Sequence, residues 1–211
     1  MTAKEITKRI LDQSKEEFSN FGFSKVTMDE IAAALGMSKK TLYKYFPSKQ
    51  VLLQRVMEAS MNEIRVGAEQ ILLDPELDFM AKLQQLLAFL GEHISQTFKQ
   101  PFLKDIRKSA PDAWDKIERF REEQIHTKFS ALIEEGIQKG MFRGDLIRQV
   151  VVLVYFNAIQ NIINPETLSQ LPFTASEVFE AIIRIIFEGI LTDTARSKLQ
   201  ETYPNKEHKS R

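Results

Sequence analysis

One short stretch of the sequence concentrates side chains that can bind a polyanion. From Ile31 to Met57 the chain has no acidic residue. The basic side chains in this stretch are Lys39, Lys40, Lys44, Lys49 and Arg55. Ammonium groups attract phosphates, and lysine also donates hydrogen bonds to guanine edges in the major groove of DNA. Charge alone leaves two interpretations open: a nucleic-acid contact, or an ordinary solvated helical face.

The excess of basic residues is local. The whole chain has 29 basic and 29 acidic side chains, so its net charge is zero. Residues 1–57 contain ten Lys or Arg against six Asp or Glu, whereas residues 58–211 contain nineteen against twenty-three. This distribution predicts that one end of the protein contacts a polyanion and the remainder does not.

Sequence patterns typical of catalysis and metal binding are missing. The chain has no GxxxxGK[ST], GxGxxG, GxSxG or HExxH motif. Its three histidines, His93, His126 and His208, are scattered, and there is no cysteine to join them at a metal. We therefore expect neither an enzyme nor a bound cofactor or metal.

The same composition indicates a cellular compartment. Without cysteine there is no disulfide framework, which suits the reducing cytoplasm. The N-terminal residues Met1 to Glu5 include charges and no apolar signal core. The longest apolar run, Val150 to Phe156, is too short to span a bilayer. We expect a cytoplasmic protein that has no membrane partner.

Helix-start and helix-stop signals surround the basic stretch. Two Thr-x-x-Glu capping boxes, at Thr2 and Thr27, predict helix starts, and Gly22 and Gly36 predict where these helices end. A third helix is predicted from Ser38 through Tyr45, and a fourth from Ser48 to about Ala68. Further helices are predicted over residues 77–98, 101–108, 111–139, 145–163 and 175–191. No convincing strand is found, so the sequence predicts an all-α fold.

The second and third predicted helices form a pair joined by a tight turn at Gly36. Leu42 and Phe46 are four residues apart, so we expect them to share one face and to pack on Ile31 and Leu35. Such a pair, with a third helix before it, is typical of a helix-turn-helix that places its second helix in a major groove.

The opposite side of that second helix is polar. Lys39 and Tyr43 share one outward face, and Lys40 and Lys44 share the neighbouring one. Cationic side chains and the positive end of the helix dipole both favour phosphates. The spacing therefore favours DNA binding over a merely solvated face.

This stretch resembles the DNA-binding signature of the TetR family of bacterial transcriptional regulators. The resemblance runs in register from Gly22 to Leu52. The matching residues are Gly22-Phe23, Val26-Thr27, Ile31-Ala32, Leu35-Gly36-Met37-Ser38, Thr41-Leu42-Tyr43, Tyr45-Phe46, Ser48-Lys49 and Leu52.

The resemblance implies an architecture and a function. We expect an N-terminal three-helix helix-turn-helix DNA-binding domain at residues 1–49 and a larger helical effector-binding and dimerisation domain at residues 50–196. A polar, frayed tail is expected at residues 197–211. The implied function is a sequence-specific repressor that a small apolar or amphipathic ligand releases from its operator. The implied partners are a near-palindromic double-stranded DNA operator, an unidentified small-molecule effector and a second copy of the chain.

The resemblance also implies roles for single residues. Thr27, Tyr43 and Lys49 match positions that usually hold phosphates. Lys39, Lys40, Thr41, Lys44 and Tyr45 match positions that approach bases or the adjacent backbone. Position 40 is often small in the family, so Lys40 is a departure and the base preference cannot be taken from relatives. For Tyr45 a core position, and for Lys44 a solvated one, remain open.

Aromatic and Met residues between positions 57 and 129 suggest an effector pocket. At helical spacing such residues fill a core or line an apolar cavity, and both interpretations stay open. The pocket candidates, with two histidines that could orient a polar group, are Met57, Met61, Phe89, His93, Phe98, Phe102, Trp114 and His126.

Two predicted helices, at residues 146–163 and 178–191, are apolar around most of their circumference. A helix of this kind is covered on more than one side. A partner subunit or a central position within one chain would each provide the cover. We expect a dimer interface, with the candidates Val151, Tyr155, Phe179, Ile183 and Phe187.

One alternative function remains open from sequence: a helical protein–protein adaptor without sequence-specific DNA binding, whose basic turn contacts an acidic partner. Salt-dependent preference for one DNA sequence over bulk DNA would separate the two.

Overall fold

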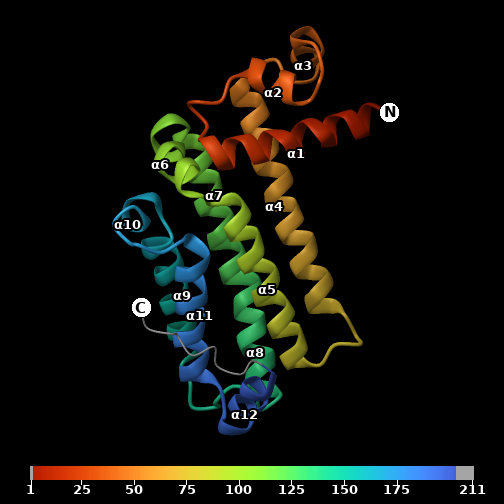
Figure 1. Ribbon diagram of the computed structural model, residues 1–211. Helices are drawn as coiled ribbons and strands as arrows, with labels where there is room; N and C mark the ends of the chain where they lie inside the picture. The colour runs from red at the N-terminus through yellow and green to blue at the C-terminus, as the bar shows by residue number, and fades with distance from the viewer. Residues whose placement is uncertain (1, 203–211) are drawn as a thin grey trace.

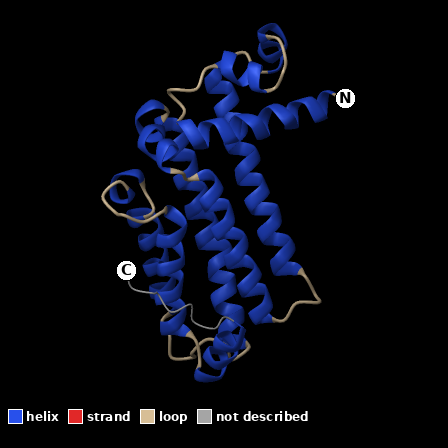
Figure 2. Cartoon of the chain, viewed as in Figure 1, coloured by secondary structure: helices blue, strands red, loops and turns tan. Residues whose placement is uncertain are grey.

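The computed structural model describes residues 2–202, without the side chains of residues 198–202. Apart from one isolated β-bridge between Phe142 and Leu191, every regular element in this range is a helix (Figure 2). The elements are α1 (Ala3–Phe21), α2 (Met28–Ala34), α3 (Lys39–Tyr45), α4 (Lys49–Leu73), α5 (Phe79–Thr97), α6 (Gln100–Ser109), α7 (Pro111–Gln124), the π-helix η1 (Ile125–Phe129), α8 (Ser130–Gln138), α9 (Arg148–Ile162), α10 (Pro165–Leu168), α11 (Ala175–Ile190) and α12 (Asp193–Thr202). The all-α prediction is confirmed.

Side-chain caps determine where the first four helices begin. Thr2 and Thr27 each form the full capping box with the Glu three residues later. Ser38 accepts the N–H of the residue three ahead at the start of α3, and Ser48 does the same for α4. Each cap satisfies backbone N–H groups that have no partner inside the helix.

The first three helices form a small unit at one end of the molecule (Figure 1). Its core is made by Ile10 and Phe18 of α1, Ile31 of α2 and Leu42 of α3, which are all buried. The N-terminal part of α4 completes this unit, and the rest of α4 runs out of it (Figure 1).

The remainder of the chain is a helical body. α5 packs on α4 and on α11, α7 packs on α4, and α11 packs on α9. In Figure 1, α4, α5 and the rod made by α7, η1 and α8 run side by side, with α9 and α11 along one flank. None of the helices in residues 2–202 is long and apolar enough to cross a membrane.

Some predicted boundaries differ from the observed ones. The helix predicted over residues 111–139 contains the π-helical turn η1, and α4 continues to Leu73, past its predicted end near Ala68. The short helix α10 was not predicted, nor was α12, which runs six residues into the predicted tail. The rest of that tail, residues 203–211, lies outside the described residues.

Candidate nucleic-acid interface

The inner face of α3 anchors it to the N-terminal unit. Leu42 and Phe46 are buried, as are Ile31 and Leu35 in and after α2. Gly36 has a φ of +64°, in the left-handed region that glycine adopts most easily, and it makes the turn between the two helices. The predicted packing of the helix pair is therefore confirmed.

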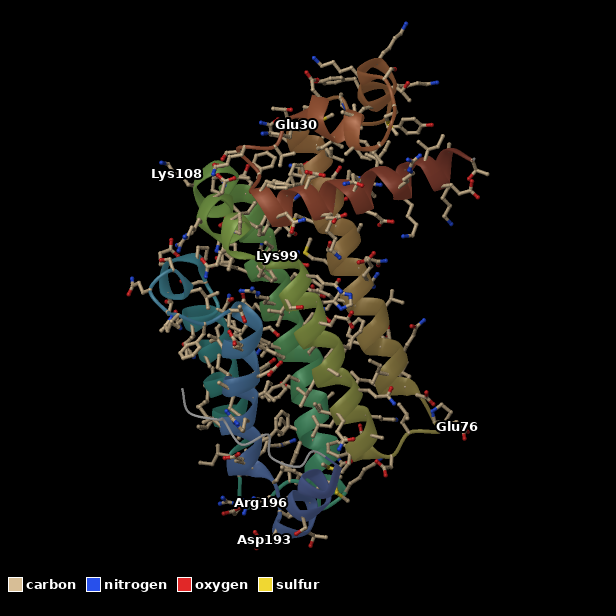
Figure 3. All side chains as sticks on the ribbon, viewed as in Figure 1. Glu30, Glu76, Lys99, Lys108, Asp193 and Arg196 are labelled. Carbon is tan, nitrogen blue, oxygen red and sulfur yellow. The ribbon has the colours of Figure 1, made fainter. Side chains whose placement is uncertain are left out.

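The outer face of α3 is solvent-exposed and basic. Side chains that end in nitrogen project from α3, away from the body (Figure 3). The exposed residues on this face are Lys39, Lys40, Thr41, Tyr43 and Lys44. The ammonium of Lys39 lies 2.5 Å from a carboxylate oxygen of Asp29, whereas Lys40 and Lys44 form no ion pair with any described residue. These two lysines are thus free to meet phosphates or base edges.

Thr27 and Tyr45 occupy different surroundings. Thr27 caps α2, and its hydroxyl donates to Glu30 at 2.8 Å and accepts the Glu30 N–H at 3.2 Å. The hydroxyl and the main-chain N–H of Thr27 both donate to the Glu30 carboxylate, and these two hydrogen bonds lower the pKa of Glu30. Thr27 remains exposed, at the positive end of α2. Tyr45 is partly buried and packs against the core, which leaves it less available to DNA than its neighbours.

Lys49 makes a set of contacts inside the chain. Its ammonium donates to the carbonyl oxygens of Phe23 (2.8 Å), Ser24 (3.2 Å) and Val26 (2.8 Å). It also lies 4.5 Å from the centre of the Phe23 ring. Desolvation lowers the pKa of Lys49, against the opposing effects of Asp105 and Glu30. An ammonium has three N–H donors, so a phosphate contact would require one of these bonds to open.

The loop held by Lys49 also touches α6. The N–H of Ser24 donates to the carboxylate of Asp105, which accepts another hydrogen bond from the Ser109 hydroxyl. Gly22, with a φ of +88°, lets α6 come close, because a Cβ there would lie 3.0 Å from the carbonyl oxygen of Pro101. Sequence reasoning missed Asp105, although it is the only acid in the otherwise basic α6.

The predicted pocket residues separate into several places. Phe98 packs edge-on against Phe102 and Trp114, with ring centres 6.2 and 6.5 Å away. Phe89 and His93 lie earlier on α5 and contact each other, with their ring centres 4.2 Å apart.

Three other pocket candidates lie on α4 and η1. Met57 is buried and Met61 partly buried on α4. His126 is exposed and lies against Phe156. His126 was predicted to line the effector pocket, and in the structure η1 turns its ring towards α9 and the surface.

The predicted dimer residues are also placed inside the chain. Tyr155, Phe179, Ile183 and Phe187 are 8% exposed or less, and Val151 is partly buried against the core. They were predicted to lie at a dimer interface, whereas within the single chain they pack on neighbouring helices. The exposed apolar residues of this region are Ile147, Val150, Leu153 and Val154 at α9, and Ile185 on α11.

A cation that sequence reasoning did not single out lies on the inner face of α7. The guanidinium of Arg121 stacks near Phe98 and Trp114 and donates to the carbonyl oxygen of Ile163 at 2.8 Å. Desolvation lowers its pKa to about 10. The available sequence signal was its spacing, since Trp114, Ile117 and Arg121 follow one helical stripe.

Comparison with known proteins agrees with this geometry. The sequence model described as "Bacterial regulatory proteins, tetR family" matches residues 10–56. The uncharacterized HTH-type transcriptional regulator YvaF of Bacillus subtilis is 32% identical over 186 residues, which cover 88% of this chain and 96% of that protein.

Solved structures share the whole fold. A TetR-family regulator from Agrobacterium tumefaciens has a TM-score of 0.68 at 15% identity, covering 90% of this chain and 100% of that one. The TetR-family regulator PfmR from Thermus thermophilus has a TM-score of 0.58 at 22% identity, covering 85% and 97%. Together with the helix-turn-helix geometry, the YvaF match shows that this chain belongs to the TetR family, whose members are DNA-binding transcriptional regulators and not enzymes.

Proposed function

We propose that the protein is a one-component repressor that binds a near-palindromic operator as a homodimer and leaves it when a small apolar or amphipathic ligand binds. The observation that carries the DNA-binding part is the outer face of α3, where Lys40 and Lys44 are exposed without an ion pair to any described residue. Residues 1–49 serve as the DNA-binding domain, and residues 50–196 serve as the ligand-binding and dimerisation domain.

The contacts to DNA follow from this geometry. Lys40 and Lys44, on the outward side of α3, read base edges, while Tyr43 and Thr27 bind the backbone on either side. Lys39 can join them because its pair with Asp29 is solvent-exposed, and such pairs contribute only about 0–1 kcal/mol. Lys49 holds the loop before α2 and so sets the angle at which α2 and α3 meet DNA.

The homodimer uses the exposed apolar strip of α9 and α11. Ile147, Val150, Leu153, Val154 and Ile185 are each 50–72% exposed. α9 and α11 pack on each other, and exposed apolar side chains gathered on one part of a protein surface mark an interaction site. In a two-fold symmetric dimer, α9 and α11 of one subunit pack on α9 and α11 of the other. The same residues are then covered on both subunits.

Two links connect the helical body to the DNA-binding unit. α4 has 25 residues and is therefore about 37 Å long, with Lys49 at the DNA end and Met61 near its middle. The second link is Asp105 of α6, which holds the loop at Ser24. A ligand that shifts α4 or α6 changes the spacing of the two α3 helices in the dimer, and binding to both half-sites depends on that spacing.

The proposal is tested by selecting DNA from a random library with the full-length protein. We expect the selected sequences to share a near-palindrome. Equilibrium binding to the selected site should then exceed binding to shuffled DNA by about a thousandfold or more. Recovery of unrelated sequences would refute the proposal and favour the adaptor function.

A further inference from the structure

The guanidinium of Arg121 lies against two aromatic side chains. Its Cζ atom lies 4.8 Å from the centre of the Phe98 ring and 5.5 Å from that of Trp114. Nη1 donates to the carbonyl oxygen of Ile163, which caps the C-terminus of α9. The favourable partners of the cation are therefore two ring faces and the negative end of a helix.

No carboxylate lies within ion-pair distance of this charge in the described part of the chain, although the charge of Glu118 opposes desolvation and raises the pKa of Arg121. Within residues 2–202, the ion pairs of 4.0 Å or less do not include Arg121. Glu118, one turn away, accepts the indole N–H of Trp114 at 2.7 Å instead. At a pKa of about 10 the guanidinium still carries its proton at neutral pH.

The guanidinium has N–H donors that no described residue uses, and their geometry is fixed by its planar structure. Only Nη1 has a hydrogen-bond partner among the described residues, so the Nε and Nη2 donors are available. Two parallel N–H donors match the two oxygens of a carboxylate. Gln160, one turn before Ile163 on α9, adds a buried side-chain oxygen without a partner in the described part of the chain. This end of α9 thus has one buried acceptor without a partner in the described residues, and Arg121 has donors that no described residue uses.

We propose that Arg121 binds the anionic head of the effector, which is an amphipathic carboxylate. The apolar part of the ligand lies along Phe98, Phe102 and Trp114, and Phe98, at the C-cap of α5, moves to admit it. This inference rests on the proposed ligand-released repressor and names the chemical class of its ligand. Because Phe102 and Asp105 are one turn apart on α6, a ligand against Phe102 also reaches the helix that holds Ser24.

Trp114 provides the measurement, because it is the only tryptophan in the chain. Its fluorescence is followed while the full-length protein is titrated with dodecanoate, dodecyl phosphate or dodecanol, which share one apolar chain. We expect dodecanoate to bind at least tenfold more tightly than dodecanol, and more tightly than dodecyl phosphate. Tighter binding of dodecyl phosphate would overturn the assignment to a carboxylate.

Variants of Arg121 distinguish a role of its charge in ligand binding from a role in folding. Arg121→Met should remove the preference for dodecanoate over dodecanol and leave dodecanol binding within a factor of two. Arg121→Lys should retain part of the preference. Arg119→Met, an exposed residue of α7, is the matched control and should behave as wild type. If Arg121→Met does not fold, as judged by circular dichroism, the wild-type comparison of dodecanoate with dodecanol still decides.

Two further outcomes would overturn the inference: equal affinities of the wild-type protein for dodecanoate and dodecanol, or no change in Trp114 fluorescence with any of the three probes. Sequence-selective DNA binding by the ligand-free protein is measured in parallel. If it persists while the carboxylate preference is absent, the ligand assignment fails and the DNA-binding function stands.

Discussion

The carboxylate of Asp105 on α6 accepts a hydrogen bond from the main-chain N–H of Ser24, in the loop between α1 and α2. From the other side, the ammonium of Lys49 donates to the carbonyl oxygens of the same loop. The DNA-binding unit is therefore held at one loop by two helices, α6 and α4.

Replacing Asp105 with Ala should loosen this loop. Hydrogen bonds to charged groups contribute about 1.5–3 kcal/mol, but Asp105 is partly exposed, so we expect the free energy of unfolding to fall by about 1–2 kcal/mol. The amide hydrogen of Ser24 should exchange at least tenfold faster. Asp115→Ala, at an exposed position of α7, is the control. Unchanged exchange at Ser24 would show that the contact does not restrain the loop.

The effect of Asp105 also depends on pH. Burial alone would raise its pKa, but hydrogen bonds from Ser109 and Ser24 and the charge of Lys49 outweigh burial and lower the pKa below its ordinary 3.8. A lowered carboxyl pKa contributes stability above the unfolded-state pKa, and that contribution is lost as the pH falls through the folded-state pKa. The difference in Tm between wild type and Asp105→Ala should thus be full at pH 7 and shrink below about pH 4. A constant difference from pH 7 to pH 3 would contradict this.

Replacing Lys49 with Met should affect stability and leave the DNA charge contacts intact. The three carbonyl oxygens would lose their donor, so we expect the free energy of unfolding to fall by about 1–3 kcal/mol. The slope of operator affinity against salt concentration should stay at the wild-type value at temperatures where the variant is folded. A direct phosphate contact would instead lower that slope by about one unit. Lys104→Met, at an exposed position of α6, serves as the stability control.

Replacing Lys40 with Ala should alter base preference. Loss of a base contact costs roughly 1–3 kcal/mol on the best site and relaxes discrimination at one or two positions. Affinities for the selected operator, its single-base variants and random DNA would be compared by fluorescence anisotropy. Lys82→Ala, far along the body on α5, is the control. Equal losses on specific and random DNA would show that Lys40 contacts only the backbone.

A charge on the exposed strip should separate the dimer. Val154→Asp or Ile185→Asp should give folded monomers, because each buried aliphatic side chain contributes about 1.5–3 kcal/mol at an interface. Ile183→Asp should instead unfold the helical body, because that side chain is already buried within one chain. Sedimentation equilibrium and circular dichroism distinguish these results. A wild-type protein that is monomeric at micromolar concentration would contradict the proposed dimer.

Local signals in the sequence predicted the N-terminal unit well. The boundaries near Thr2, Thr27 and Ser38 depend on hydrogen bonds that span three residues, so the sequence displays them directly. The packing of Leu42 on α2 follows from helical periodicity in the same way.

Long-range packing could not be predicted. The ammonium of Lys49 meets carbonyl oxygens 23 to 26 residues earlier, and Arg121 meets Ile163 42 residues later. The inward face of α11, by contrast, was within reach of the sequence. Glu177, Glu180, Arg184 and Glu188 recur at helical spacing on its exposed side, where Ile185 also lies, and Ile183 is buried on the other side.

The most direct test of the central claim is the stoichiometry and sequence preference of operator binding by the full-length protein. Analytical ultracentrifugation would be combined with anisotropy titrations of a selected near-palindrome, its isolated half-site and shuffled DNA. The account predicts two chains per operator, much weaker binding to the half-site, and affinity for shuffled DNA lower by about a thousandfold or more. One chain per operator, or equal affinity for operator and shuffled DNA, would contradict it.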